Sequence, residues 1–142
     1  MRVYRAEAVI AAPIERVWAV LTDFDAYPAW NPFTVEVRTT RALGSPVDMR
    51  VDLGWAGLRW QRETLLALEP YRLVWGITAP PRALLWARRE QTLEAVAGGT
   101  LYRSADTIGG AIEPLVRALF GAVVQRGFDR MAPALRLRAE QA

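Results

Sequence analysis

The sequence predicts an α+β fold in which an antiparallel sheet of about seven strands is followed by one long C-terminal helix. Two observations predict this fold. Hydrophobic residues alternate with a period of two through the middle of the chain, and they follow a helical period after Gly109–Gly110. No repeat, low-complexity segment or linker interrupts residues 1–142, so we expect a single domain over the whole chain.

The N-terminal segment predicts one strand followed by helical turns. Arg2–Ile10 has the pattern of a strand. In "AAPIERVWAVLTD" a proline precedes apolar residues at helical spacing, which predicts a helix from Pro13 to about Leu21. We expect a second turn of helix around Asp23–Tyr27.

The next segment, "YPAWNPF" (residues 27–33), carries three large aromatic residues and two prolines. Each proline fixes φ, removes a backbone donor and disfavours the α region for the residue before it, so we expect a loop. Asn31–Pro32 should set the turn, and Phe33 should start the next strand with its ring inward. We expect the aromatic residues to form a structural plug at one end of the long helix rather than to contact a ligand.

From Phe33 onward the hydrophobic period is two. In "VDMRVDL", Val47–Leu53, apolar residues alternate strictly with Asp and Arg, which predicts a strand with one buried and one solvated face. We expect similar strands at Phe33–Arg41, Leu58–Leu68, Tyr71–Thr78, Leu84–Val96 and Thr100–Ile108. The connections between them are too short for helical crossovers, so these strands should form an antiparallel meander.

The segment after Gly110 predicts a helix of roughly 25 residues. Pro114 stands near its start, where a proline is tolerated. Its apolar stripe consists of Ile112, Val116, Leu119, Phe120, Val123, Gly127, Met131 and Ala134. A stripe of this length must be buried, and the apolar face of the sheet is the surface available to cover it.

The composition excludes several kinds of chemistry. The chain contains no cysteine, histidine or lysine, so we expect no metal, no cofactor and no Schiff-base chemistry. All 18 basic residues are arginine, and they are interspersed with 15 acidic residues for a net charge of +3, so we expect no nucleic-acid partner. No apolar run is long enough for a signal peptide or a membrane span, so we expect a cytoplasmic protein.

Four segments carry a resemblance to a known superfamily: "APIERVWAVLTDFDAYPAWNPF" (Ala12–Phe33), "LEPYRLVWG" (Leu68–Gly76), "LEAVAGGT" (Leu93–Thr100) and "RGFDRM" (Arg126–Met131). Along essentially its whole length the chain resembles the START/polyketide-cyclase superfamily, also called SRPBCC, and in particular its bacterial polyketide cyclase/dehydrase-like members. The resemblance implies a helix-grip fold, in which a curved antiparallel sheet wraps around the long C-terminal helix with a cavity between them. This superfamily includes lipid carriers, hormone receptors and aromatase/cyclases, so the resemblance names no ligand.

Wide side chains and charges on the inward strand faces form the candidate site. Aromatic walls with a few fixed polar groups are typical of small-molecule sites, although core packing is the simpler account of any one tryptophan. In "LRWQRETLLAL" the alternation puts Arg62 on the apolar face with Trp60, and in "TLYRSADTI" it puts Asp106 beside Tyr102. The predicted ligand-binding residues are Trp60, Arg62, Trp75, Trp86, Tyr102, Ser104, Asp106, Leu119 and Val123.

Arg62 and Asp106 have two interpretations. Buried charges are normally compensated, so the two side chains could simply pair. They could instead orient or transform a ligand, because aromatase/cyclases of the superfamily use arginine and tyrosine on a polyketide, which would make Arg59, Arg62 and Tyr102 the positions to test. Without a histidine, Asp106 or Glu63 would have to act as the base, with a raised pKa.

The sequence favours a carrier or sensor of a hydrophobic small molecule, such as a lipid, a polyketide or an aromatic compound, because binding needs no placed base. The first alternative is a polyketide cyclase, dehydratase or hydrolase that uses Arg62, Tyr102 and Asp106. The second is a protein-interaction module similar to the co-chaperone branch of the superfamily, whose signature would be an exposed apolar patch that includes Trp30 and Phe33. The sequence predicts no oligomeric state.

Overall fold

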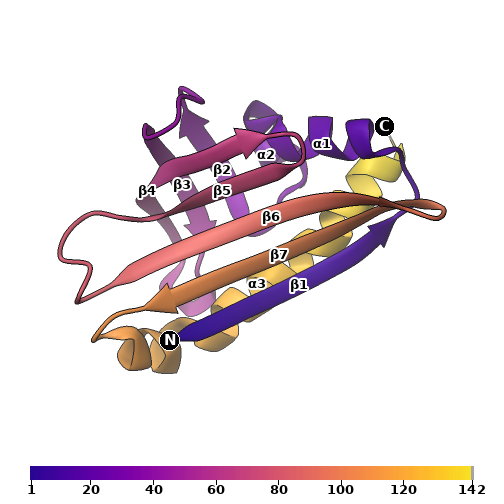
Figure 1. Ribbon diagram of the computed structural model, residues 1–142. Helices are drawn as coiled ribbons and strands as arrows, with labels where there is room; N and C mark the ends of the chain where they lie inside the picture. The colour runs from indigo at the N-terminus through magenta and orange to yellow at the C-terminus, as the bar shows by residue number, and fades with distance from the viewer. Residues whose placement is uncertain (142) are drawn as a thin grey trace.

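The computed structural model describes residues 1–141 as a seven-stranded antiparallel sheet with one long helix beside it (Figure 1). This arrangement confirms the predicted α+β helix-grip fold. The elements are β1 (Arg2–Ile10), α1 (Ile14–Thr22), η1 (Phe24–Ala26), α2 (Tyr27–Trp30), β2 (Thr34–Thr39), β3 (Pro46–Asp52), η2 (Gly54–Ala56), β4 (Leu58–Glu69), β5 (Arg72–Ile77), β6 (Trp86–Val96), β7 (Gly99–Gly109) and α3 (Glu113–Gln141).

The strands lie in the order β1-β7-β6-β5-β4-β3-β2, so the predicted meander runs from β2 to β7 and β1 pairs with its last strand. β1 and β7 are in register from Arg2 opposite Ile108 to Ile10 opposite Thr100. The register shifts between Leu65 and Ala67 in β4, an irregularity of the kind that bends a strand. The sheet therefore curves, and α3 passes behind β7 and β1 in Figure 1.

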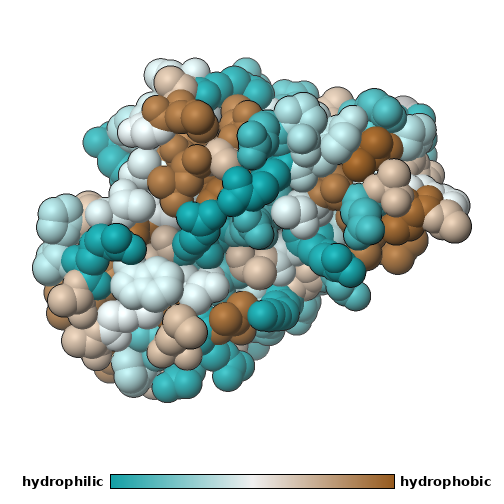
Figure 2. Space-filling model, viewed as in Figure 1, coloured by the Kyte–Doolittle hydropathy of each residue, from teal (hydrophilic) through white to brown (hydrophobic). Residues whose placement is uncertain are grey.

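The two faces of the sheet differ in polarity. In β6, Ala87 and Leu93 are buried on the face toward α3, whereas Arg88 and Glu94 are exposed on the outer face. Figure 2 shows hydrophilic residues, in teal, through the middle of this outer face. The core therefore lies between the inner face of the sheet and the helices.

α3 approaches the sheet closely at a glycine. The Phe33 ring lies over Gly127, where a Cβ atom would collide with it. The same ring packs edge-on against Phe128, with 5.1 Å between the ring centroids. These contacts set the separation between the helix and β2. Among residues 1–141 no helix has both the length and the apolar character needed to cross a bilayer.

Two local predictions were wrong. Residues 27–30, expected to be a loop, form the short helix α2. Pro28 is compatible with it because the first helical turn needs no backbone N–H donor. α3 has 29 residues rather than roughly 25, since it continues past Pro133 to Gln141. The turn η2 was not predicted, and the other elements begin and end within two residues of their predicted positions.

Candidate functional site

A cavity of about 240 Å³ lies between the inner face of the sheet and α3. Its walls are mainly apolar and include four residues at i, i+4 spacing on α3. The apolar lining consists of Phe33, Met49, Val51, Leu53, Trp75, Ile77, Leu85, Ala87, Ile108, Val116, Phe120, Val124 and Phe128.

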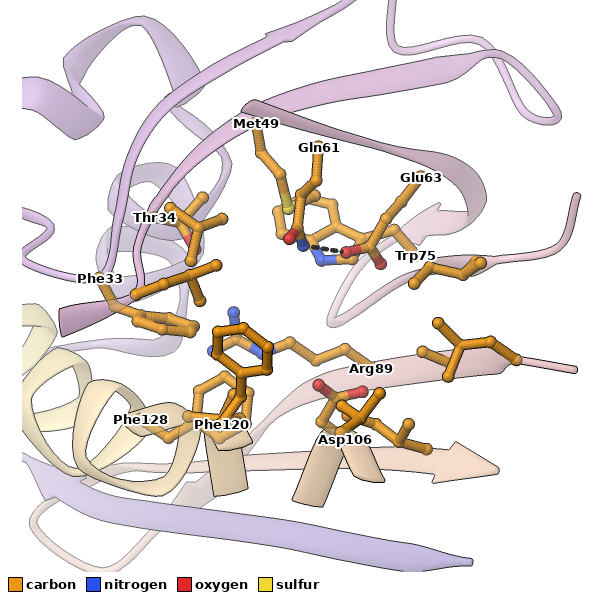
Figure 3. Close-up of a pocket in the computed structure, with 18 residues that line it drawn as sticks. Phe33, Thr34, Met49, Gln61, Glu63, Trp75, Arg89, Asp106, Phe120 and Phe128 are labelled. Carbon is orange, nitrogen blue, oxygen red and sulfur yellow. Dashed lines mark hydrogen bonds between the residues drawn. The ribbon is translucent and has the colours of Figure 1, made fainter. Parts of the chain in front are cut away.

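Five polar side chains interrupt this lining: Thr34, Gln61, Glu63, Arg89 and Asp106. They come from β2, β4, β6 and β7, so most of the strands contribute to one site. Figure 3 shows the Arg89 side chain extending through the middle of the cavity, with Glu63 and Asp106 on opposite sides of it. The site thus combines an apolar enclosure with one cation and two carboxyl groups.

The Arg89 guanidinium is buried but not neutralised by direct contact. Nε donates to Ser104 Oγ at 3.1 Å, and Nη2 lies 3.5 Å from Tyr102 Oη and 3.2 Å from Met131 Sδ. The guanidinium carbon lies 4.4 Å from the centroid of the Phe128 ring, a cation–π contact. Within residues 1–141, Arg89 forms no ion pair, and its Nη1 donates to no acceptor.

A second layer of polar groups holds the guanidinium from behind. Tyr102 Oη donates to Gln91 Oε1 at 2.6 Å. Burial raises the pKa of Tyr102 above its usual value, so the phenol stays neutral and can accept from Arg89. Ser104, Tyr102 and Gln91 are all buried. The position of the guanidinium is therefore set before any ligand arrives.

Both carboxyl groups have raised pKa values. Burial, and secondarily the negative charge of Asp106, raises the pKa of Glu63 to about 7, although a 2.7 Å hydrogen bond from Gln61 and the charge of Arg89 oppose the shift. Burial raises the pKa of Asp106 to about 6, against the opposing charge of Arg89. Near neutral pH the site therefore holds one carboxylate and one group close to half protonation, a pair suited to accepting and donating a proton.

Two of the predicted ligand-binding residues, Trp75 and Asp106, line the cavity. Tyr102 and Ser104 lie on the predicted inner face of β7, but they contact Arg89 rather than the cavity itself. Glu63, expected only as an alternative base, is part of the lining.

The predicted placement of Arg62 was wrong. Arg62 lies on the outer face, where its Nε donates to Asp48 Oδ1 at 2.7 Å, so it neither enters the cavity nor pairs with Asp106. Trp60 is also exposed on the outer face, where its ring centroid lies 4.6 Å from the Arg38 guanidinium carbon. Arg59 is exposed at the start of β4, where its Nε donates to Ala56 O at 2.9 Å. The inward residues of β4 are instead Gln61, Glu63 and Leu65. The apolar residues of this strand are divided between the two faces, and the irregularity after Leu65 changes the alternation.

Three further residues lie outside the cavity. Trp86 immediately precedes the inward Ala87 on β6, so its side chain is on the other face of the strand, and it pairs with Gly109 of β7. Leu119 is 47% exposed, and Val123 packs against Gly54 of η2. The inward stripe of α3 runs through Val116 and Phe120 instead, so the predicted stripe was too broad.

Sequence reasoning missed Arg89, although a signal was present. Every second residue from Arg88 to Glu94 is polar, as expected for a solvated face. The intervening positions are therefore inward, and they place Arg89 and Gln91 between Ala87 and Leu93. A charge at an inward position of a strand is the clue that identifies this residue.

The "YPAWNPF" segment has its aromatic residues in three different surroundings. Tyr27 is fully buried and its Oη donates to Leu21 O at 2.5 Å, as a plug would. Phe33 points inward as predicted and also forms part of the cavity wall. Trp30 is half-buried beside a separate cleft. Asn31 sets the turn, because its Oδ1 accepts from the backbone N–H groups of Phe33 and Thr34, each at 3.0 Å.

Comparison with known proteins identifies a family and a fold. Residues 1–136 match the family model described as polyketide cyclase / dehydrase and lipid transport, which confirms the predicted resemblance. No significant match is found among curated protein sequences.

Three solved structures illustrate the similarity of fold. The Zhui aromatase/cyclase from Streptomyces sp. R1128 is 19% identical, with a TM-score of 0.75 over 99% of this chain and 94% of that one. A START superfamily protein from Mycobacterium smegmatis is 17% identical, with a TM-score of 0.72 over 98% and 97% of the two chains. Protein MLL2253 from Mesorhizobium loti is 24% identical, with a TM-score of 0.68 over 99% and 95%. At these identities the similarity shows the fold alone.

The raised pKa of Glu63 predicts a specific pH dependence of stability. Because the folded state binds the proton more tightly than the unfolded state, Glu63 favours folding at low pH, and that contribution is lost as the pH rises from about 4.5 to about 7. Glu63→Gln keeps an acceptor for Gln61 and removes the ionisation. We expect it to raise the free energy of unfolding by about 2–3 kcal/mol at about pH 8, and by much less at about pH 5.

Urea denaturation across this pH range measures the difference. The matched control is Glu94→Gln on the exposed face of β6, for which we expect a small difference that does not change with pH. A Glu63→Gln difference that is constant between the two pH values would contradict the assignment.

Proposed function

The chain belongs to the polyketide cyclase / dehydrase and lipid transport family, and we propose that it binds a small, flat, hydrophobic molecule with one acidic oxygen in the cavity, as a carrier or sensor. The observation that supports this most strongly is the Arg89 guanidinium, which is buried among apolar walls and has no carboxylate in direct contact within residues 1–141. The acidic oxygen is a carboxylate or the enolate or phenolate oxygen of an aromatic or polyketide compound.

The dimensions of the cavity favour a compact ligand. About 240 Å³ lies just below the usual range of ligand cavities, roughly 300–1,000 Å³, so a compact ligand fits it better than a diacyl lipid. The rings of Phe33, Trp75 and Phe120 line it, and they provide flat surfaces for one or two fused rings. Of the ligand classes expected from the sequence, an aromatic or short polyketide compound fits these walls better than a membrane lipid.

Arg89 supplies the polar anchor that such a ligand needs. A guanidinium held by Ser104 and Tyr102 loses little conformational entropy when it binds, and its Nη1 donates to no acceptor among residues 1–141. In a low-dielectric site a charge-assisted hydrogen bond to an anionic oxygen is stronger than the same bond in water. The ligand would thereby provide an anionic oxygen in direct contact with Arg89, which no carboxylate among residues 1–141 does.

The energetics are consistent with moderate affinity. A flat ligand that buries about 300 Å² of apolar surface gains roughly 7–8 kcal/mol at about 25 cal/mol per Å². Association costs about 4 kcal/mol or more, so apolar contact alone gives an affinity near the millimolar range. A hydrogen bond to the charged Arg89 adds about 1.5–3 kcal/mol, which makes binding roughly ten to a hundred times tighter.

A pair of arginine variants tests this proposal. Calorimetry with naphthoate and with the uncharged naphthamide separates the charge from the shape of the ligand. We expect Arg89→Gln to weaken naphthoate binding at least about tenfold and to change naphthamide binding little. Arg62→Gln, which makes the same change on the outer face, should leave both affinities unchanged. Equal losses for the two ligands, or no binding of either to the unmodified protein, would contradict the proposal.

An enzymatic role is the second candidate, and the raised pKa values of Glu63 and Asp106 favour it. With a β-hydroxy ketone as substrate, one carboxylate would remove a proton from the carbon between the carbonyl and the hydroxyl-bearing carbon, while Arg89 stabilises the enolate oxygen. The other carboxyl group, when protonated, would donate its proton to the departing hydroxyl, which leaves as water. This is the predicted cyclase/dehydratase alternative with Asp106 kept and with Arg89 and Glu63 in place of Arg62 and Tyr102.

The enzymatic candidate is tested by the loss of water from a one-ring β-hydroxy ketone, followed by the absorbance of the enone product. If the protein is an enzyme, Glu63→Gln and Asp106→Asn should abolish elimination while binding persists. If the unmodified protein binds naphthoate but eliminates water no faster than buffer does, the enzymatic candidate fails and the carrier or sensor role remains.

The interaction-module alternative loses its main support. It required Trp30 and Phe33 to form an exposed apolar patch, but Phe33 is 6% exposed and forms part of the cavity wall. Trp30 is half-buried.

A further inference from the structure

A second cleft, of about 230 Å³, shares no lining residue with the central cavity. It is formed by α1, η1, α2 and the last turns of α3. Its lining consists of Arg16, Ala19, Val20, Asp23, Ala26, Trp30 and Arg138.

Donor groups in this cleft lack acceptors. Arg16 Nε and Trp30 Nε1 are buried, and neither has a hydrogen-bond partner among residues 1–141. Arg16 and Arg138 take part in no ion pair in the same range, and neither does Asp23, the one acidic residue in the lining. Buried donors are normally paired, so the orphaned N–H groups of Arg16 and Trp30, together with the Arg138 guanidinium, which forms no ion pair within residues 1–141, indicate a missing acceptor.

The sequence produces this arrangement through helical spacing. Arg16, Ala19, Val20 and Asp23 recur at i, i+3, i+4 and i+7, which aligns them along one face of α1 and its C-cap. Trp30 ends α2 and packs edge-on against the buried Tyr27, with 5.2 Å between the ring centroids. The indole is thus held by the core while one side of it borders the cleft.

From these contacts we infer that the cleft between α1, α2 and the end of α3 binds a small organic monocarboxylate. Two arginines and one aspartate give the lining a formal charge of +1, which matches a monoanion. Guanidinium groups bind carboxylates with bidentate geometry, and a small side-chain shift would bring the same oxygens to the orphaned N–H groups. Ala19, Val20 and Ala26 offer room for a short apolar tail, while Asp23 disfavours a second negative charge.

Indole N–H signals in ¹H–¹⁵N NMR spectra test this inference, with Trp30 assigned from the spectrum of Trp30→Phe. We expect butyrate to shift the Trp30 signal in a saturable way at millimolar concentrations, and the neutral butyramide to leave it unchanged. Inorganic phosphate, largely a dianion near neutral pH, should bind at least about tenfold more weakly.

Variants locate the binding. Arg138→Gln, at an exposed position, should weaken butyrate binding at least about threefold, and the Arg16→Gln/Arg138→Gln double variant at least about tenfold. Arg89→Gln should not affect it, so this result is independent of the function proposed for the central cavity. The inference is overturned if the Trp30 signal does not respond to butyrate at tens of millimolar, if the folded double variant responds as the unmodified protein does, or if phosphate binds as tightly as butyrate.

Discussion

The buried positive charge of Arg89 is the constraint on which the rest of the site depends. An arginine inside an apolar core is tolerated only if its donors are satisfied and its charge is compensated. Ser104, Tyr102 and the Phe128 ring satisfy part of this requirement, and the carboxyl groups of Glu63 and Asp106 face the guanidinium without touching it within residues 1–141. The result is a polar centre that is held in place but incompletely paired.

The architecture keeps space around that centre. Phe33 rests on Gly127, and this contact holds α3 against β2 at one end of the cavity. Beyond it, the inward residues of α3 and the curved sheet enclose the open volume around Arg89. The same low-dielectric enclosure raises the pKa values of Glu63 and Asp106. The packing that forms the cavity is therefore also the cause of the raised proton affinity of its carboxyl groups.

The fold was predictable from the sequence because periodicity reports it directly. The alternation in Val47–Leu53, the short connections between strands and the helical period after Gly110 predicted the antiparallel meander and the long helix. The curvature of the sheet around the helix was implied by the family resemblance, and the pairing of β1 with β7 was not predicted. The site was harder to predict because it depends on which face of each strand turns inward. On β7 the predicted inward face was correct. On β4 the prediction assigned Arg62 to the wrong face, because the apolar Trp60 is exposed and the register shifts after Leu65. Whether Arg89 faces a cavity or a charged partner depends on how the strands and α3 pack together. The pattern of a single strand does not contain this information.

The most direct test of this account is a crystal structure of the protein with naphthoate bound. The account predicts the naphthoate carboxylate within hydrogen-bonding distance of Arg89 Nη1, with its rings between Phe33, Trp75 and Phe120, while Arg89 keeps its contacts with Ser104 and Tyr102. Naphthoate bound outside the cavity would contradict the account. So would naphthoate inside the cavity that does not contact Arg89, with the Arg89 guanidinium in a direct ion pair with Glu63 or Asp106.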